Sequence, residues 1–271
     1  MRYFKKMRRA FTMVELIFAM VVLGIVSSMG ADMIANIYKS YLLQRAEHSS
    51  SIKAEIASLQ IANRLRYAIP GTVFRIKSDG TLESVNTPLT GASSDYIGLQ
   101  WVAYDGDSFE TADTPGWSGL CDVSVSTKDK MVVKGSDLDL ADTIIDKLSN
   151  GTKGIDDTVV YFPSGTHEYN VSKSADDNLS FDTASDMVEE HYKLAWSSYA
   201  LIVEGGDLNL YYNFAPQPGA PRGNTKSLLL QGVTTFKFKG AGGVIRFKIC
   251  KSENIGDTDK NITSCKEKAV F

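Results

Sequence analysis

Residues 8–26 read RRAFTMVELIFAMVVLGIV, and this stretch decides the fold. Two arginines and the small Ala10 precede Phe11, after which the chain is almost continuously apolar. Glu15 is the exception: a charged acid at the centre of a membrane helix costs roughly 2.5–3.5 kcal/mol on insertion scales, so a partner is expected. Cleavage between Ala10 and Phe11 would supply one, because it creates an α-amine four residues before Glu15. The dipole of a helix also favours a carboxylate in the first turn.

The apolar run is long enough to cross a membrane. The 16 residues from Leu16 to Ala31 are followed by further apolar residues up to Ile37. A helix over residues 11–37 would be about 40 Å long, against a hydrocarbon core of about 30 Å. We therefore expect a basic leader over residues 1–10 and a transmembrane helix over 11–37.

Charge is distributed unevenly between the leader and the rest of the chain. Residues 1–10 carry five of the chain's 29 Lys and Arg and no acid. Residues 11–271 therefore contain 24 Lys and Arg against 32 Asp and Glu, which gives them a net charge of −8. The positive-inside tendency predicts that the leader stays in the cytoplasm and that the body is translocated into the periplasm. An acidic body argues against direct nucleic-acid binding through a broad basic face.

The basic leader and the Phe-Thr-x-x-Glu-Leu pattern over residues 11–16 resemble the processing segment of type IV pilins and type II secretion pseudopilins. In that family a membrane-embedded prepilin peptidase cuts before the Phe and methylates its amine, which here implies cleavage at Ala10-Phe11 and N-methylation of Phe11. The resemblance also implies that Glu15 registers each subunit against the amine of a neighbour. The family usually has Gly before the cut, where this chain has Ala10.

Two other interpretations of the N-terminus remain open. An ordinary secretory signal would place a small-x-small cleavage site at Ser28-Met29-Gly30 and free Ala31. A plain uncleaved anchor helix would leave the segment in place. Both leave the spacing of Phe11 and Glu15 without an explanation.

The residues after the membrane segment predict a continuation of the helix. No Pro or Gly occurs over residues 38–69, and Pro70-Gly71 ends the pattern. Apolar residues recur at helical spacing, namely Ile52, Ile56, Leu59, Leu65 and Ile69. We expect an amphipathic helix whose apolar stripe packs on an antiparallel sheet, which is the α+β arrangement that the pilin family implies.

Residues 70–271 predict one β-rich globular unit. Strands are expected over residues 96–104 and 158–162, with hairpins pairing 199–203 with 208–212 and 233–238 with 244–249. The second hairpin alternates apolar and polar residues, so one of its faces is expected to be buried against the helix. Polar segments 105–115 and 172–190 are expected as surface loops, and 135–148 as a short helix.

Three cysteines suggest one disulfide. Cys250 ends a predicted strand and Cys265 precedes the C-terminal run, so a bridge closes a 14-residue loop, worth on the order of 3 kcal/mol. An oxidising periplasm favours that bond. Cys121 is then expected as a free thiol.

Signals for cofactors and catalysis are weak. Asp257-x-Asp259-x-Asn261 begins like a calcium loop, but Ile262 stands at the glycine position and Lys268 at the bidentate-acid position. A solvated loop closed by the disulfide is therefore favoured over a calcium site. His48, His167 and His191 form no His-Glu-x-x-His pair.

Together these observations predict a structural subunit with no chemistry of its own. The most specific hypothesis is a minor pseudopilin of a type II secretion or related type IV pilus-like or DNA-uptake filament, anchored in the bacterial inner membrane. Its implied partners are other pilin-like subunits, the prepilin peptidase and an inner-membrane assembly platform. The alternative is a signal-anchored periplasmic binding protein or enzyme unrelated to pili.

Overall fold

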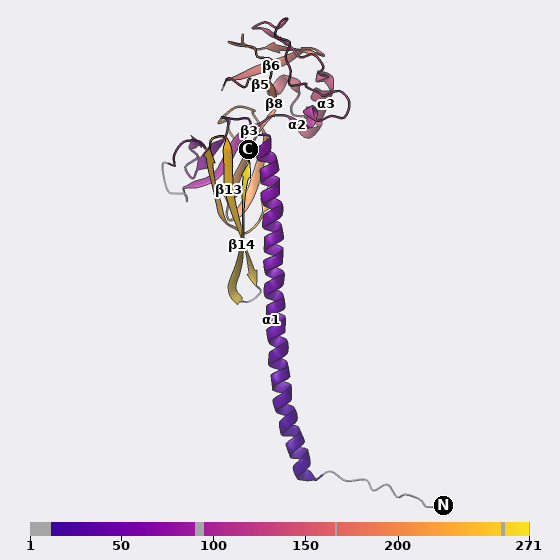
Figure 1. Cartoon of the computed structure of the whole chain (residues 1–271), viewed down its shortest axis with the longest axis vertical. Coiled ribbons are helices and arrows are strands. Elements are labelled where there is room, and N and C mark those ends of the chain that lie inside the picture. The colour runs from indigo at the N-terminus through magenta and orange to yellow at the C-terminus, as the bar shows by residue number, and fades with distance from the viewer. Residues whose placement is uncertain (1–11, 90–94, 166, 256–257, 271) are drawn as a thin grey trace, which may run out of the picture.

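The computed structural model describes residues 12–89, 95–165, 167–255 and 258–270. It is organised around one helix, α1 (Met13–Arg66), which contains 54 residues and is therefore about 81 Å long. Figure 1 shows that the lower half of α1 projects away from the rest of the chain, while the upper half lies against the sheets. The helix was expected to reach Ile69, but the Ile69 N–H instead donates to the Val102 carbonyl, 2.9 Å away.

The β-rich part forms three antiparallel sheets within the described ranges. A six-stranded sheet has the order β11-β10-β9-β3-β1-β2. Its strands are β1 (Phe74–Lys77), β2 (Leu82–Ser84), β3 (Tyr96–Ala103), β9 (Ser197–Glu204), β10 (Asp207–Phe214) and β11 (Lys226–Leu230). A three-stranded sheet consists of β12 (Val233–Ala241), β13 (Val244–Ile255) and β14 (Thr258–Val270).

The third sheet builds a separate unit at the upper end of the molecule (Figure 1). Its order is β4-β7-β6-β5-β8. Its strands are β4 (Lys130–Val132), β5 (Thr158–Tyr161), β6 (Glu168–Ala175), β7 (Asn178–Phe181) and β8 (Lys193–Ala195). Short helices accompany it, namely α2 (Gly106–Phe109), α3 (Leu138–Leu148) and the 3-10 turn η1 (Ile155–Asp157). The predicted helix over 135–148 is thereby confirmed as α3.

The described residues form two main hydrophobic cores. One joins the upper half of α1 to the six-stranded and three-stranded sheets, with Ile61, Trp101 and Phe247 at its centre. The other lies between α3 and the five-stranded sheet and includes Ile145 and Leu179. A smaller cluster bridges the two units. The long helix on antiparallel sheets is an α+β architecture consistent with a pilin-like fold.

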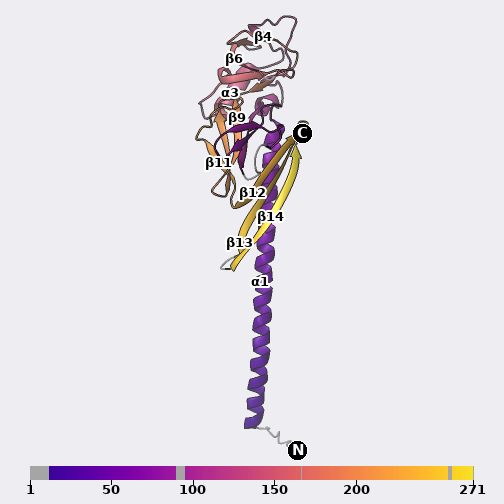
Figure 2. The same ribbon diagram turned by 90° about the vertical axis from the view of Figure 1, so that its left-hand side faces the viewer.

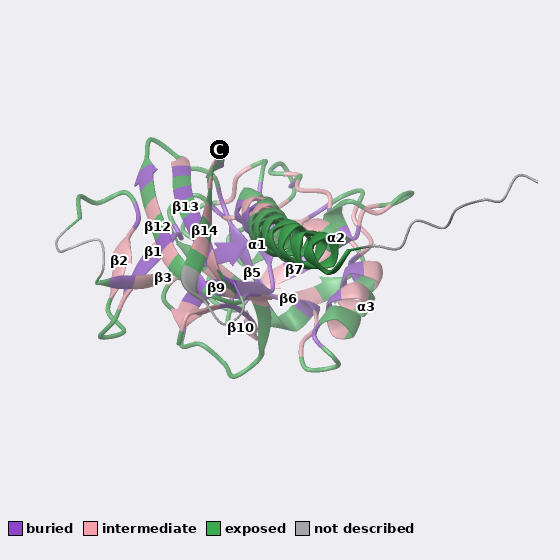
Figure 3. Cartoon of the chain, turned by 90° about the horizontal axis from the view of Figure 1, so that it is seen from below, coloured by how far each residue is buried: buried purple, intermediate pink, exposed green. Residues whose placement is uncertain are grey.

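The face of α1 that packs on the sheets matches the predicted stripe at Leu65, and Ile69 just after the helix is buried as well, but the rest of the stripe differs. Small residues supply most of the buried stripe, which consists of Ser50, Ala54, Ala57, Ser58, Ile61 and Leu65. Three predicted core residues instead face outward: Ile52 is 45% exposed, Ile56 50% and Leu59 45%. Figure 3 views α1 from its lower end, with the sheets packed along one of its flanks. Small side chains allow the helix backbone to approach a sheet closely, so the larger residues are left on the opposite face.

Both predicted hairpins are present and have the expected turns. Gly205 and Gly206, between β9 and β10, have φ angles of 59° and 86°. Gly242 and Gly243, between β12 and β13, have φ angles of 60° and 82°. Two successive residues with positive φ are what a two-residue type I′ turn requires, and glycine adopts them without steric cost. One face of the second hairpin is buried against α1, as its alternating pattern predicts.

Three segments expected to be loops contain regular structure. Of the predicted loop 251–264, residues 251–255 belong to β13 and 258–264 to β14, with Lys251 opposite Ser264. The predicted loop 172–190 holds the end of β6 and all of β7, and 105–115 holds α2. These expectations were wrong because pairing between strands depends on backbone hydrogen bonds, which polar sequences also form. Figure 2 shows β13 and β14 running down alongside α1.

Candidate assembly surface and N-terminal motif

The first turn of α1 positions Glu15. Thr12 caps the helix, because its Oγ1 accepts a hydrogen bond from the Glu15 N–H at 3.3 Å. The Glu15 side chain is exposed within the first turn, where the positive end of the helix dipole stabilises a carboxylate. Ala10 and Phe11 lie outside the described residues, so cleavage and N-methylation there stay predictions.

The lower half of α1 is apolar and uncovered. An 18-residue window has a mean hydropathy of 2.1, and none of it is buried inside the protein. Among the helices of the described ranges, α1 is the one long and apolar enough to cross a membrane. Glu15 and Asp32 bracket 16 uncharged residues, a length of about 24 Å as a helix. This exposed segment is consistent with membrane anchoring.

The upper half of α1 also presents an apolar row to its surroundings. Ile52, Ile56 and Leu59 follow one another at spacings of four and three residues, which places them on one face of the helix. That face is opposite the stripe that packs on the sheets. Contiguous exposed apolar residues mark interaction surfaces in soluble proteins. We call Ile52, Ile56 and Leu59 the outer row of α1.

Polar contacts fasten β13 and β14 to α1. The Lys268 Nζ lies 2.6 Å from one oxygen of Glu55, and the Lys266 Nζ lies 3.7 Å from the other. The hydrogen bond from Lys268 lowers the pKa of the Glu55 carboxyl below its ordinary value. Nearer the membrane segment, the hydroxyl of Ser50 donates to the Lys251 carbonyl at 3.1 Å. The helix and the hairpin are thus held in one register.

Two of the three cysteines form a disulfide, and the third is a free thiol. Cys250 of β13 is directly opposite Cys265 of β14, and a disulfide joins them in the structure. The bond links the two strands in the middle of their pairing. Cys121 is a buried free thiol whose Sγ lies 3.2 Å from the Ser126 hydroxyl. Burial raises the pKa of the Cys121 thiol. The contribution of each cysteine to stability stays a prediction.

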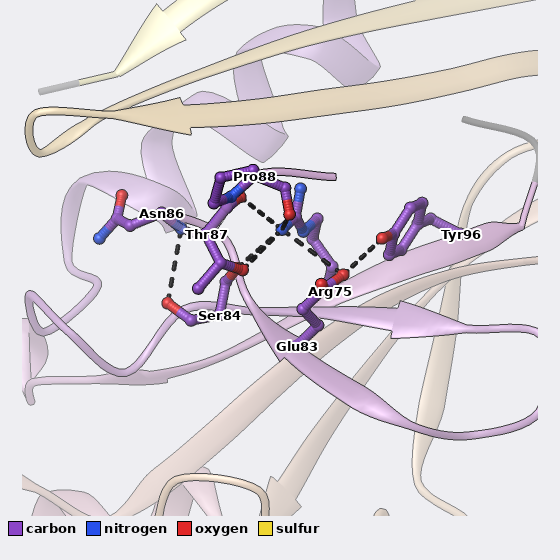
Figure 4. A network of polar contacts seen from close by, with 7 residues as sticks. All are labelled: Arg75, Glu83, Ser84, Asn86, Thr87, Pro88 and Tyr96. Atoms are coloured by element: carbon purple, nitrogen blue, oxygen red, sulfur yellow. Dashed lines mark hydrogen bonds and ion pairs between the residues drawn. The ribbon is translucent and has the colours of Figure 1, made fainter. Parts of the chain in front are cut away.

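A buried arginine forms a polar network that sequence reasoning missed (Figure 4). Arg75 of β1 is 1% exposed, and its Nη2 donates to the Thr87 carbonyl at 2.7 Å and the Ser84 carbonyl at 3.0 Å. Glu83 lies 3.5 Å from the same nitrogen and accepts a hydrogen bond from the Tyr96 hydroxyl. The network fixes the segment after β2 onto the sheet, which is a structural role. A single Arg in a short strand gives no sequence signal of burial.

The residues of the partial calcium pattern that the structure describes belong to a strand. Asp257 lies outside the described residues, whereas Asp259 and Asn261 belong to the extended strand β14. Lys268, at the position of the bidentate acid, is paired with Glu55. Within the part of the chain that the structure describes, no group of three or more His, Cys, Asp or Glu side chains could hold a metal ion.

Comparison with protein families identifies the N-terminus. A family model described as the prokaryotic N-terminal methylation motif matches residues 5–31, a span that includes Ala10, Phe11 and Glu15. The motif marks type IV pilin-like, prepilin-type proteins, and this chain carries it at the start of a long apolar helix on an α+β fold. In general the motif implies processing by a prepilin peptidase and assembly with other pilin-like subunits, a role that is typically structural. Neither the search of curated proteins nor that of solved structures found a match.

Proposed function

We propose that this protein is a structural subunit, specifically a minor pseudopilin, of a type II secretion or related type IV pilus-like or DNA-uptake filament. The observation that carries the proposal is the combination of the methylation motif with a helix whose lower half is apolar and uncovered and whose upper half leaves the outer row exposed. In the lower half this exposure suits lipid or neighbouring helices. In the upper half, the outer row lies beyond the membrane segment and suits neighbouring subunits.

Assembly would begin with processing at the N-terminus. The prepilin peptidase cuts between Ala10 and Phe11 and methylates the amine of Phe11. The subunit then remains in the inner membrane through residues 11–37, with the leader side in the cytoplasm and the body in the periplasm. At an inner-membrane assembly platform, Glu15 pairs with the methylated amine of a neighbouring subunit. This pairing removes the cost of an isolated carboxylate in an apolar environment.

A minor role rather than a major one is supported by the body of the chain. This chain carries a second β unit with its own core, in addition to the part of the body that packs on α1. Such a unit suits a subunit present in few copies, at the tip or at the start of the filament. No reaction is assigned to the protein.

Co-expression with a prepilin peptidase tests processing. The expected product starts at N-methylated Phe11, so the mass falls by that of residues 1–10 and rises by one methyl group. Ala10→Trp should block the cut, because the residue before it has to be small. An unchanged mass in the presence of active peptidase would contradict the proposal. A mature N-terminus at Ala31 would instead support the signal-anchored periplasmic protein.

The role of Glu15 is tested by comparing Glu15→Val with Glu47→Val. Both positions are exposed acids on α1, but Glu47 lies outside the matched motif. Glu15→Val should leave insertion and the β-rich body intact and should reduce crosslinking to neighbouring subunits. Glu47→Val should leave crosslinking unchanged. Normal crosslinking of Glu15→Val would show that this carboxylate has no part in assembly.

A further inference from the structure

A groove is lined by residues from the end of α1, from α2 and α3, and from the strands β9, β10 and β11. Figure 1 shows the end of α1 close to α2 and α3. The groove has a volume of about 980 Å³. One wall is the last turn of the helix, with Asn63, Arg64 and Tyr67, and the floor includes Tyr199 of β9 and Tyr212 of β10. The opposite wall comes from α2, α3 and Trp196. Concave sites where two structural units meet are the usual places for ligands.

One border of the groove is an unpaired strand edge. β11 is the last strand of its sheet and pairs with β10, and within the described residues with no other strand. Ser227, Leu228 and Leu229 of β11 line the groove, and Leu228 is 49% exposed. A strand at the end of a sheet presents free N–H and C=O groups that another extended chain pairs with. Figure 2 shows β11 at the outer side of the sheet, beneath the upper unit.

The side chains around the groove suit a ligand with mixed chemistry. Tyr67 and Tyr104 pack with their ring centroids 5.1 Å apart, and the Tyr67 hydroxyl donates to Glu110 at 3.1 Å. The guanidinium of Arg64 lies over the ring of Tyr199, 5.5 Å from its centroid. Both signs of charge therefore line one aromatic groove. A ligand of one sign, such as a nucleic-acid strand, would meet repulsion as well as attraction.

The backbone of the floor is distorted at the same place. Asn213 lines the groove with a φ of 60°, in the left-handed region that residues other than glycine rarely adopt. The pairing of β10 with β9 is interrupted between Tyr211 and Phe214, and the Asn213 N–H donates instead to the Ser197 hydroxyl at 3.0 Å. Asparagine is among the non-glycine residues that adopt this region most readily, so the irregularity is a bulge built into the strand beside the groove.

We propose that this groove binds an extended polypeptide segment of a partner protein, which adds to the sheet as a strand alongside β11. The main chain of the segment would pair with the free edge of β11. Every second side chain would then point to the aromatic floor, because side chains alternate along a strand. A polypeptide matches all three features of the site, namely the backbone edge, the aromatic floor and the mixed charges. The proposal does not depend on processing at Ala10 or on filament assembly.

The experiment uses the full chain in detergent and a phage library of random linear ten-residue peptides. Selected peptides should carry apolar or aromatic residues at every second position, and their binding should slow hydrogen exchange of the amides in residues 226–230. Methylating the backbone nitrogens of alternate peptide residues provides the sharpest test. In one register this should weaken binding by more than about tenfold, because several hydrogen bonds are lost, and in the other register it should have little effect.

Two matched leucines test the location. Leu228 is 49% exposed and Leu120 is 48% exposed, but Leu120 lies away from the groove. Leu228→Ala should weaken peptide binding while Leu120→Ala leaves it unchanged, with equal urea midpoints for both variants. The proposal is overturned if no peptide is enriched, if the two N-methylation registers behave alike, or if Leu228→Ala binds as the wild type does. A processed chain that binds no peptide would leave the filament proposal standing and remove this one.

Discussion

Two isoleucines on opposite faces of α1 allow the packing of the helix to be measured. Ile61 is fully buried in the core shared with the sheets, whereas Ile56 is 50% exposed in the outer row. Replacing each with Ala removes the same atoms from the same helix. The change in helix propensity is also the same, so it cancels in the comparison.

The expected costs follow from burial. Ile→Ala removes three carbons, worth about 0.8 kcal/mol each when fully buried, or about 2.4 kcal/mol for Ile61. The cavity left in a packed core adds to this, so Ile61→Ala should lower the free energy of unfolding by about 3–4 kcal/mol. Half of the Ile56 side chain is already in contact with water and its loss leaves no cavity, so Ile56→Ala should cost about 1 kcal/mol or less.

Urea unfolding of the full chain in detergent, followed by tryptophan fluorescence, measures both values. Trp101 is a suitable reporter because it is buried in the same core as Ile61. In a reconstituted filament the order should reverse, with Ile56→Ala reducing incorporation although it barely affects stability. Equal stability losses for the two variants would refute the assignment of the buried and outer faces of α1.

Three further predictions concern the body of the chain. Cys250→Ser and Cys265→Ser should each cost about 2–5 kcal/mol without adding to one another, whereas Cys121→Ser should cost much less; urea titration and peptide mapping without reduction check this. Burial raises the pKa of Asp105 above the value of about 4 that an aspartate has in the unfolded chain, so the fold loses stability as the pH rises above about 4 and this carboxyl is forced to ionise. Asp105→Asn cannot ionise, so its free energy of unfolding should increase relative to that of the wild type as the pH is raised, which urea unfolding at a series of pH values measures. The lowered pKa of Glu55 means that its contribution is present at neutral pH and is lost as the pH falls below the ordinary range of a glutamate. Glu55→Gln should therefore be less stable than the wild type at pH 7, and the difference should shrink steadily as the solution is acidified.

The elements with strong local signals were predictable from the sequence. The first part of the helix needed only a long apolar stretch without Pro, and its continuation followed from residues 38–69, which contain neither Pro nor Gly. Its start is marked by Thr12 and Glu15. The two hairpins followed from paired glycines at positions where positive φ is required, such as Gly205-Gly206. These signals lie within a few residues of one another, and for that reason a single sequence reveals them.

The buried face of the helix could not be predicted in the same way. Hydrophobic periodicity assumes that the largest apolar residues are the buried ones. In this chain Ala54 and Ala57 are buried and Ile52 and Ile56 are not, because the sheet approaches the helix closely on its small-residue side. Only the position of the sheet decides between the two faces, and that position depends on contacts such as that of Glu55 with Lys268, 213 residues apart in the chain.

The groove and the Arg75 network depend on still more distant contacts. The groove brings together the end of α1 near Tyr67, the segment around Asp107 and the edge strand β11. No motif connects these segments, and aromatic residues in strands are more often core than binding surface. Arg75 similarly sits in a short strand whose neighbours give no indication that a cation is buried there.

With residues 11–37 in a bilayer, as predicted, the uncovered stretch of α1 would also set how far the body stands from the membrane. Twelve residues lie between Ile37, where the predicted span ends, and Ser50, the first residue of α1 buried by the sheets, a rise of about 18 Å. Asn63 at the groove lies 26 residues beyond Ile37, a height of up to about 39 Å if the helix stands upright. The length of the helix would therefore determine the height of the groove above the membrane. A segment anchored in the same membrane would need more than ten extended residues to reach the groove, so short juxtamembrane tails are excluded by distance alone.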